Sequence, residues 1–450
     1  MNAMENSNQH FDVIISGGGL SGSLMALSLS QLSKGDGSLL SIAIIETQPF
    51  SQTSSADENS LFDERVLALS HGSARYLAKL GVWQYLKDDA SAITDIDISD
   101  RGHFAKARLT AKEYGVNALG YVIEMALIGK GQLKALSNNT ITAKKCTATN
   151  STSVKKNIHW FSPDSIADIN WQSQEQDKDT IDKTQVKVTL NSGKILSAKL
   201  LLGCDGAQSP VRKLANIDVT CDDYQQVALI ANVSTSKAHH HKAFERFTEF
   251  GPIAMLPLKS LKSLKSVKAK VRTAAAGASR CSLVWTMTPA QAAEIKHLSD
   301  DDFKVKLERA FGSYLGAITH VGKRDTYPLV LLQAQQQTYH RMALVGNASH
   351  TIHPIAGQGF NLGLRDVEVM ADLIKNALAA GQDIGDFALL HSYQMNRAKD
   401  QQQVIQLTDS LVTLFANNLP PLILGRNIGL QALNVISPLK DALVKKTMGY

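Results

Sequence analysis

Three glycines near the start of the chain have the spacing of a dinucleotide-binding turn. They form the pattern Gly17-x-Gly19-x-x-Gly22. In such a turn the first glycine permits the bend, the second lets the backbone approach a pyrophosphate, and the third lets a helix pack on a strand. Glu46 follows about 24 residues after Gly22, where a carboxylate can accept hydrogen bonds from both hydroxyls of an adenosine ribose. This pattern alone does not distinguish FAD from NAD.

The segments around these residues predict the β-α-β unit that the turn requires. Residues 11–16 (FDVIIS) are a short apolar run that predicts a buried strand. Leucines at helical spacing from Leu20 predict a helix of about 13 residues, and residues 39–46 (LLSIAIIE) predict the second strand. Strand, helix and strand in this order are typical of a parallel sheet. A glycine-rich turn in some other α/β fold is the weaker alternative.

Later segments predict two groups of strands and three further helices. Strands are expected over 120–128, 186–190, 195–202 and 341–345, and those of a second, mostly antiparallel sheet over 227–233, 254–258 and 281–287. Helices are expected around 77–86, after 128 with Leu133 and Leu136, and over 361–379, where apolar residues recur at helical spacing.

Two segments far from the first turn distinguish the alternatives left open by the glycines. They are residues 201–212 (LLGCDGAQSPVR) and 346–363 (GNASHTIHPIAGQGFNLG). Together with the first turn they resemble the three sequence fingerprints of the flavoprotein aromatic hydroxylases, the family of p-hydroxybenzoate hydroxylase. The resemblance covers roughly residues 10–450, and residues 243–258, 353–367 and 408–430 are most similar to the ubiquinone-biosynthesis branch.

The resemblance implies an α/β fold with three parts. The first is a Rossmann-type FAD-binding domain like that of p-hydroxybenzoate hydroxylase, followed by a substrate domain built on the antiparallel sheet and a C-terminal helical region. The implied boundaries are 10–75, 120–220 and 331–400 for the FAD domain, 76–119 and 221–330 for the substrate domain, and 401–450 for the helical region.

The resemblance also implies which residues contact the flavin. Most relatives carry Asp at position 347, where Asn347 can still bond a ribityl hydroxyl but brings no charge. Arg65 is expected near the cofactor, with a surface ion pair as the alternative, and Asp205 at the flavin rather than in a simple turn. The implied cofactor contacts are Gly17, Gly19, Gly22, Glu46, Arg65, Gln132, Asp205, Gly206, Asn347, Pro354, Gly357, Gln358, Gly359 and Asn361. The residues expected at the reacting centre are Arg65, His353 and Pro354.

Histidines give weaker signals. His350 and His353 titrate near neutral pH and are candidates for proton transfer, but histidines in such loops more often hold the loop through hydrogen bonds. The run His239-His240-His241 lacks further ligands at sensible spacing, so it is interpreted as a solvated turn and no metal site is predicted.

Composition excludes several other classes of protein. The chain of 450 residues is 44% hydrophobic and 20% charged, which is ordinary for a globular protein of two or three domains. A net charge of +6 without a recognition motif does not indicate nucleic-acid binding. Four cysteines without a CxxC pair argue against zinc and dithiol chemistry and favour a reducing, cytoplasmic setting.

Two basic segments leave membrane contact open. Residues 259–280 are rich in lysine and are interpreted as a solvated hairpin insertion, with a basic helix lying on a membrane as the less favoured alternative. The C-terminal segment with Lys440, Lys445 and Lys446 suits peripheral attachment and packing on the domain core equally well.

Taken with the motifs, the resemblance implies an FAD-dependent monooxygenase of ubiquinone biosynthesis. It would use NAD(P)H and O2 to hydroxylate the ring of a polyprenylated phenol of the 2-polyprenyl-6-methoxyphenol type. The implied partners are this phenol and O2, with peripheral contact to the inner face of a membrane and to other quinone-biosynthesis proteins left open. The alternatives are an epoxidase or prenyl reductase on the same fold, a flavoprotein scaffold of a quinone-synthesis assembly, and an NAD dehydrogenase.

Overall fold

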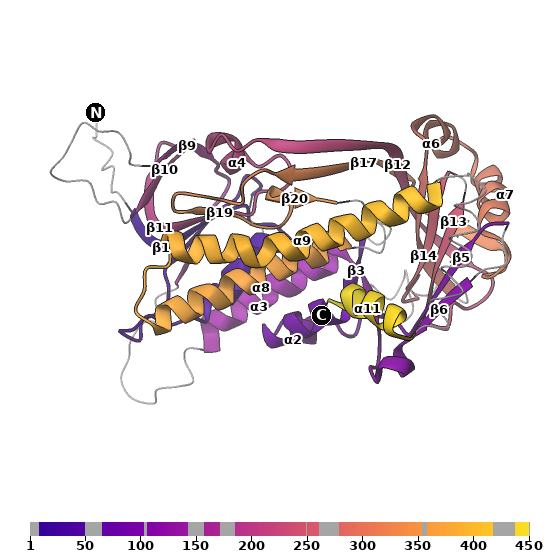
Figure 1. Ribbon diagram of the computed structural model, residues 1–450, viewed down its shortest axis with the longest axis horizontal. Helices are drawn as coiled ribbons and strands as arrows, with labels where there is room; N and C mark the ends of the chain where they lie inside the picture. The colour runs from indigo at the N-terminus through magenta and orange to yellow at the C-terminus, as the bar shows by residue number, and fades with distance from the viewer. Residues whose placement is uncertain are drawn as a thin grey trace.

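A computed structural model describes most of the chain in two large sheets connected by a long ribbon and covered by helices (Figure 1). The described residues are 9–49, 65–102, 106–142, 157–171, 185–248, 250–260, 279–352, 358–416 and 437–449. The segment 261–278, which makes up most of the predicted basic insertion, therefore lies outside the described residues, as does 417–436.

The first sheet is built around parallel strands. Its order is β18-β19-β11-β1-β2-β8, and β10 and β9 extend it beside β11. β1 pairs in parallel with both β2 and β11, while β10 and β18 pair antiparallel. The strands are β1 (Gln9–Ser16), β2 (Ile42–Ile45), β8 (Ile158–Phe161), β9 (Ile166–Asn170), β10 (Val186–Leu190), β11 (Ile195–Gly203), β18 (Thr338–Tyr339) and β19 (Met342–Leu344).

Helices cover one face of this sheet. They are α1 (Leu20–Ser30), α3 (Met125–Thr142), α8 (Gln358–Ala379) and α9 (Phe387–Ala416). α8 and α9 run beside each other across the molecule (Figure 1). Side chains from α1, α8 and the sheet form one core that includes Leu24, Leu200 and Met370. The other face of the central strands packs in a second core that includes Ile14, Leu201 and Val211. Because both faces of these strands are buried, their sequences are continuous apolar runs.

The second sheet is mostly antiparallel. Its order is β20-β17-β12-β15-β14-β13-β5-β6, with β16 also paired to β12. β13 and β5 are the parallel exception. The strands are β5 (Asp95–Asp100), β6 (Lys106–Thr110), β12 (Val219–Thr235), β13 (Lys242–Thr248), β14 (Gly251–Leu258), β15 (Ser279–Met287), β16 (Ile318–Val321), β17 (Asp325–Ala334) and β20 (His350–Thr351).

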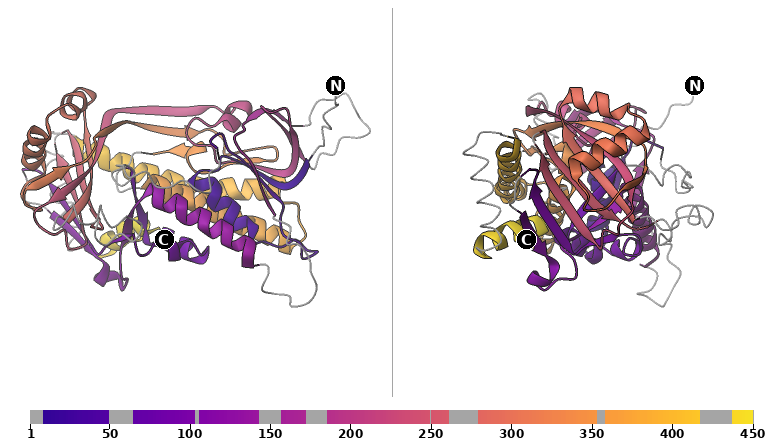
Figure 2. Two further views of the ribbon diagram at one scale, coloured as in Figure 1. Left: turned by 180° about the vertical axis from the view of Figure 1, so that it is seen from behind. Right: turned by 90° about the vertical axis from the view of Figure 1, so that its right-hand side faces the viewer.

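The two faces of the second sheet have different neighbours. α6 (Pro289–Lys296) and α7 (Asp300–Phe311) cover the outer face, where Leu283 packs against Phe303 and Leu307. The opposite face, called the inner face below, looks back toward α8 and α9 (Figures 1 and 2). A small sheet of β3 (Val66–Ser70), β7 (Gly120–Glu124) and β4 (Ser91–Ile93) packs against the inner face.

The C-terminal helix α11 (Ser437–Met448) packs on the domain core. Val444 and Met448 are buried against Leu109 and Leu119. Lys440 lies 2.6 Å from a carboxylate oxygen of Glu113, and Lys446 lies 2.7 Å from one of Asp400. Of the two alternatives for this segment, the described residues show the packed helix. No described helix is long and apolar enough to cross a membrane.

Two predicted elements have different bounds in the structure. The strand expected over 120–128 ends at Glu124, because the apolar run continues into α3 from Met125. The helix expected around 77–86 is α2 (His71–Lys79) followed by a separate turn of 3-10 helix, η2 (Trp83–Tyr85). The parallel first sheet and the mostly antiparallel second sheet are both as predicted, whereas the domain boundaries stay a prediction.

Candidate functional site

The first glycine turn is too crowded for any larger residue at two of its three positions. Gly17 adopts φ +92°, and its N–H donates to the carbonyl oxygen of Ile45 over 2.8 Å. A Cβ atom on Gly22 would lie 1.8 Å from the carbonyl oxygen of Gly17. A Cβ atom on Gly19 would have open space around it. The space beside Gly19, at the start of α1, is where the motif expects a pyrophosphate to approach the helix N-terminus.

Glu46 directly follows β2 and is held by local hydrogen bonds. Its Oε2 atom accepts a hydrogen bond from the N–H of Gly18 over 2.7 Å. Its Oε1 atom accepts from the hydroxyl of Thr47 at 3.1 Å and from the N–H of Gln48 at 2.8 Å. A carboxylate offers about four acceptor positions, so Glu46 retains capacity for one hydroxyl of a ribose while these three bonds fix its orientation.

Asp205 follows β11 and carries an unsatisfied buried oxygen. Its Oδ2 atom accepts from the N–H of Val211 at 3.0 Å and from the hydroxyl of Ser16 at 3.3 Å. Its Oδ1 atom is buried and has no hydrogen-bond partner among the described residues. Burial raises the pKa of this carboxyl, against the hydrogen bonds that lower it. A buried acceptor without a partner is costly, and a hydroxyl of a bound cofactor would satisfy it.

Arg212 connects the second fingerprint to the third. Its guanidinium donates to the carbonyl oxygen of Ala348 at 2.7 Å and to that of Ala207 at 2.8 Å. Asn347, beside Ala348, is exposed in the 3-10 turn η5 (Gly346–Ala348). The two loops are therefore fixed relative to each other, with Asn347 and Gly206 (φ +82°) on neighbouring turns.

A buried ionic network holds the third fingerprint in place. Asp366 of α8 is fully buried, and its Oδ2 atom accepts from the N–H of Gly346 at 2.9 Å and from His350 at 2.8 Å. Its Oδ1 atom accepts from Arg397 at 2.6 Å and from Gln401 at 3.1 Å. Burial opposes ionisation, but the charges of His350 and Arg397 prevail and keep the pKa of Asp366 well below its usual range. His350 thus holds the loop, which was the favoured alternative to proton transfer.

The first turn of α8 combines an anchored side chain with open space. Asn361 is buried, and its Oδ1 atom accepts from the N–H of Ser70 at 2.9 Å while its Nδ2 atom donates to the carbonyl oxygen of Ala68 at 2.8 Å. Its amide therefore connects α8 to β3. A Cβ atom on Gly359 would meet only the Cγ1 atom of Ile352, at 3.8 Å. Gln358 is buried beside Gly359.

For the remaining predicted site residues, the structure gives the burial or one contact, or does not describe the residue. Gln132 of α3 is buried, and its Nε2 atom has no hydrogen-bond partner among the described residues. Arg65 is exposed at the start of β3, where its carbonyl oxygen accepts from the N–H of Met125 at 3.2 Å. His353, Pro354 and Gly357 lie outside the described residues.

The structure reveals one candidate that sequence reasoning missed, Glu245 of β13. Ladder pairing aligns it with Ile98 on one side and with Ala254 and then Val284 on the other, all on the inner face. Within the part of the chain that the structure describes, no charge or hydrogen bond offsets its burial, which raises its pKa to about 7. The side chain keeps some contact with solvent. Strand alternation at Ala243, Glu245 and Phe247 was the available signal.

The histidine run at 239–241 forms a turn between β12 and β13. His239 lies 3.0 Å from the carbonyl oxygen of Leu258, and the backbone N–H of His241 donates to the Nδ1 atom of His239. This geometry agrees with the interpretation as a turn.

These features together define a dinucleotide site of the flavoprotein type. Gly17 and Gly22 lie in a turn that has no room for a larger residue at either position. Asp205 and Gln132 each have a buried polar atom without a hydrogen-bond partner among the described residues, and a cofactor with hydroxyls and a heterocyclic ring could bond both atoms. The residues present therefore fit FAD.

Comparison with known proteins identifies the family. The model of the FAD binding domain family matches residues 162–408, and the chain belongs to this family. It is 31% identical to a ubiquinone hydroxylase, UbiL, of Rhodospirillum rubrum over 97% of this chain and 89% of that protein. It is 28% identical to the 3-demethoxyubiquinol 3-hydroxylase of Escherichia coli over 98% of this chain and all of that protein. The predictions of a flavoprotein, of FAD as cofactor and of a monooxygenase are confirmed.

A solved structure supports the fold. PqsL of Pseudomonas aeruginosa, in complex with 2-aminobenzoylacetate, superposes with a TM-score of 0.68 at 19% identity, covering 91% of this chain and 97% of that one. The p-hydroxybenzoate hydroxylase-like α/β fold expected from the sequence is thereby confirmed.

Proposed function

We propose that this FAD-dependent monooxygenase hydroxylates the aromatic ring of a polyprenylated phenol of the 2-polyprenyl-6-methoxyphenol type in ubiquinone biosynthesis, using NAD(P)H and O2. The observation that carries the proposal is the similarity, over nearly the full length of both chains, to two hydroxylases named for ubiquinone and demethoxyubiquinol. Reduced FAD supplies the oxygen-transfer chemistry when bound, so the protein must hold the cofactor, position the phenol and manage its proton.

The proposed cofactor contacts follow from the three fingerprints. The backbone at Gly17, Gly19 and Gly22 and the N-terminus of α1 would hold the pyrophosphate. Glu46 would accept from an adenosine ribose hydroxyl, and Asp205 from a hydroxyl close to the pyrophosphate or ribityl chain.

The other proposed contacts lie toward the flavin ring. Asn347 would bond the ribityl chain, Gln132 would donate its unsatisfied amide, and the backbone at Gln358 and Gly359 would lie against the ring. The N-terminus of α8 would stabilise negative charge on the reduced ring. Arg65, His353 and Pro354 remain proposed for the reacting centre. Asn361 would position the first turn of α8 at the flavin, because its side chain hydrogen-bonds the backbone of β3.

The inner face of the second sheet suits the phenol. Ile98, Ala254 and Val284 make an apolar row beside Glu245. The row continues through Ile230 and ends at Asp325 of β17, which lies 2.8 Å from Lys323. Ala243 on the same strand packs against Ile93 and Val122 of the small sheet, so this face is turned toward the flavin elements. Two further charged groups lie on this face. The guanidinium of Arg280 is 3.1 Å from the carboxylate of Glu124, and Asp100 lies at the end of β5, where it is aligned with Phe247 of β13. We propose that Glu245 accepts the proton of the phenol, because a base with a pKa near 7 works best at neutral pH.

The purified yellow holoenzyme tests the proposal against its alternatives. NADH and NADPH oxidation is followed with a short-chain prenylated methoxyphenol, with the same phenol lacking the prenyl chain, and with the prenyl chain lacking the phenol. The proposal expects the prenylated phenol to accelerate oxidation and to gain one oxygen atom by mass. An oxygenated or saturated prenyl chain with an unchanged ring would instead establish an epoxidase or a reductase, and no product from any substrate would favour a scaffold.

A further inference from the structure

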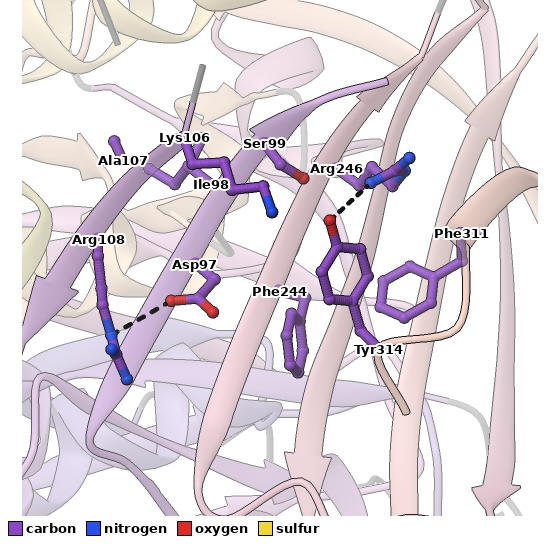
Figure 3. A pocket seen from close by; sticks show the side chains of 10 residues that line it. All are labelled: Asp97, Ile98, Ser99, Lys106, Ala107, Arg108, Phe244, Arg246, Phe311 and Tyr314. Carbon is purple, nitrogen blue, oxygen red and sulfur yellow. Dashed lines mark hydrogen bonds and ion pairs between the residues drawn. The ribbon is translucent and has the colours of Figure 1, made fainter. Parts of the chain in front are cut away.

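A polar pocket lies on the outer face of the second sheet, opposite Glu245. Its volume is about 270 Å³. Strands β5, β6 and β13 and the segment after α7 enclose it (Figure 3). Phe244 and Arg246 of β13 line it, and because side chains alternate along a strand they face away from Glu245 between them. The side chains of Phe244 and Arg246 therefore place the pocket on the opposite side of β13 from Glu245, while Ile98 of β5 borders both the pocket and the inner-face row.

Four hydrogen-bond donors from four segments of the chain gather at this pocket. Figure 3 shows the ammonium of Lys106, the hydroxyls of Ser99 and Tyr314 and the guanidinium of Arg246 directed toward a common region. The Nη1 atom of Arg246 lies 3.4 Å from the hydroxyl of Tyr314, and the Nζ atom of Lys106 lies 5.2 Å from the centre of the Tyr314 ring. The hydrogen bond from Lys106, and then that from Arg246, lower the pKa of Tyr314.

The charge of the pocket is positive. Its lining holds three cationic side chains and one carboxylate, that of Asp97. Asp97 already has two cationic neighbours, since Arg108 lies 3.5 Å from one of its oxygens and Lys242 lies 3.0 Å from the other. Arg108 also pairs with Asp95 at 3.0 Å. Lys106 and Arg246 are the remaining cationic side chains of the lining. The Nε atom of Arg246 is also buried without a hydrogen-bond partner among the described residues.

The remaining wall is aromatic. Phe244 packs edge to face on Phe311 with ring centres 5.7 Å apart, and Tyr314 lies 6.0 Å from Phe244. Donors approaching from several directions suit a tetrahedral anion better than a planar carboxylate, which arginine typically binds through two parallel bonds. The aromatic wall offers apolar surface to whatever group the anion carries.

We propose that this pocket binds a phosphate group through Lys106, Arg246, Ser99 and Tyr314. The phosphate belongs either to the headgroup of an anionic phospholipid or to a soluble phosphate ester. The first source would hold the outer face of the second sheet against a membrane, and the second would make the pocket a ligand site independent of lipid.

Binding to the FAD-loaded enzyme tests the assignment. Inorganic phosphate is titrated by calorimetry, and binding to phosphatidylcholine vesicles is measured by sedimentation with and without phosphatidylglycerol. The test variants are Tyr314→Phe, which keeps the aromatic wall, and the double variant Lys106→Ala/Arg246→Ala. The matched control is Lys187→Ala/Lys194→Ala, which removes the same charge from β10 and the turn after it in the first sheet. FAD content and melting temperature show that each variant is folded.

The proposal expects phosphate to bind the wild type and the control equally. It expects the double variant to bind at least about 100-fold more weakly, since it removes two charged donors and each charged hydrogen bond is worth about a factor of ten or more. Vesicle binding that requires phosphatidylglycerol and is lost in the double variant assigns the lipid source, and phosphate binding without vesicle binding assigns the soluble one. Equal phosphate affinity in the wild type and the double variant, or no binding to either, would overturn the proposal.

Discussion

Replacing Glu245 by glutamine removes one proton acceptor from the inner face with little change in shape. In the folded protein burial raises the pKa of Glu245 from its ordinary 4.5 to about 7. The folded state therefore prefers the protonated acid. Below pH 4.5 the group is protonated whether the chain is folded or not, and it costs no stability. As pH rises from 4.5 through 7 the folded state must ionise a carboxylate that burial disfavours, so stability falls over that window.

The size of this effect follows from the shift. One pKa unit corresponds to about 1.4 kcal/mol, so full transfer of the shift would destabilise the folded state by about 3 kcal/mol above pH 7. Because Glu245 keeps some contact with solvent, we expect about 1–2 kcal/mol. Between pH 5 and pH 8 the wild type should lose that much more unfolding free energy than Glu245→Gln. Glutamine also cannot accept the proton of the phenol, so ring hydroxylation should slow by about 100-fold and lose its rise through pH 7.

Urea unfolding at the two pH values measures the difference in stability. Product formation measured from about pH 6 to about pH 9, a range that includes the pKa of Glu245, gives the pH profile of the rate. FAD content serves as the control, because Glu245 lies on the sheet and not at the fingerprints. A variant that hydroxylates at the wild-type rate with the wild-type pH profile would show that Glu245 is not the proton acceptor. A wild type whose stability relative to the variant does not fall with pH would show that its pKa is not raised.

Three further substitutions test the cofactor site. Gly22→Val should yield colourless protein of reduced melting temperature, because even its Cβ atom would lie 1.8 Å from the carbonyl oxygen of Gly17; a yellow, stable variant would contradict the tight turn. Gly359→Val should keep the melting temperature of the FAD-free protein, since the added Cβ atom meets only Ile352, at 3.8 Å. The variant should nevertheless lose FAD, and a normal FAD content would show that the flavin ring does not lie against Gly359. Asp366→Asn removes one of the two carboxylates that pair with the buried Arg397, the other being Asp400 at 2.8 Å. It should lower the free energy of urea unfolding by about 1.5–3 kcal/mol, whereas an unchanged value would mean the network does not stabilise the fold.

The parts of the fold that could be predicted are those set by local sequence. The strand at 11–16, the turn at Gly17 and the helix after it form one local unit, in which the apolar run, the glycines and the helical spacing each indicate one kind of structure. The prediction of a strand over 120–128 was wrong beyond Glu124, because a short apolar run does not distinguish a buried strand from the start of a buried helix.

Parts set by distant contacts could not be predicted. β12 was expected over 227–233 but begins at Val219, since its exposed first half is held by backbone pairing to β17 rather than by an apolar pattern. The ion pair between Asp366 and Arg397 joins α8 to α9 through two residues 31 positions apart in sequence, and no local signal reveals it. Glu245 was passed over because its importance depends on which side of the second sheet meets the flavin elements.

The central claim, that the enzyme transfers oxygen from O2 to a phenol ring, is tested most directly with labelled oxygen. The holoenzyme is supplied with NAD(P)H, a short-chain prenylated methoxyphenol and ¹⁸O2 in ordinary water, and the product is fragmented in a mass spectrometer to locate the label. We predict one ¹⁸O atom on the aromatic ring and none on the prenyl chain. A product whose new oxygen comes from water, or whose label lies on the prenyl chain, would contradict the claim.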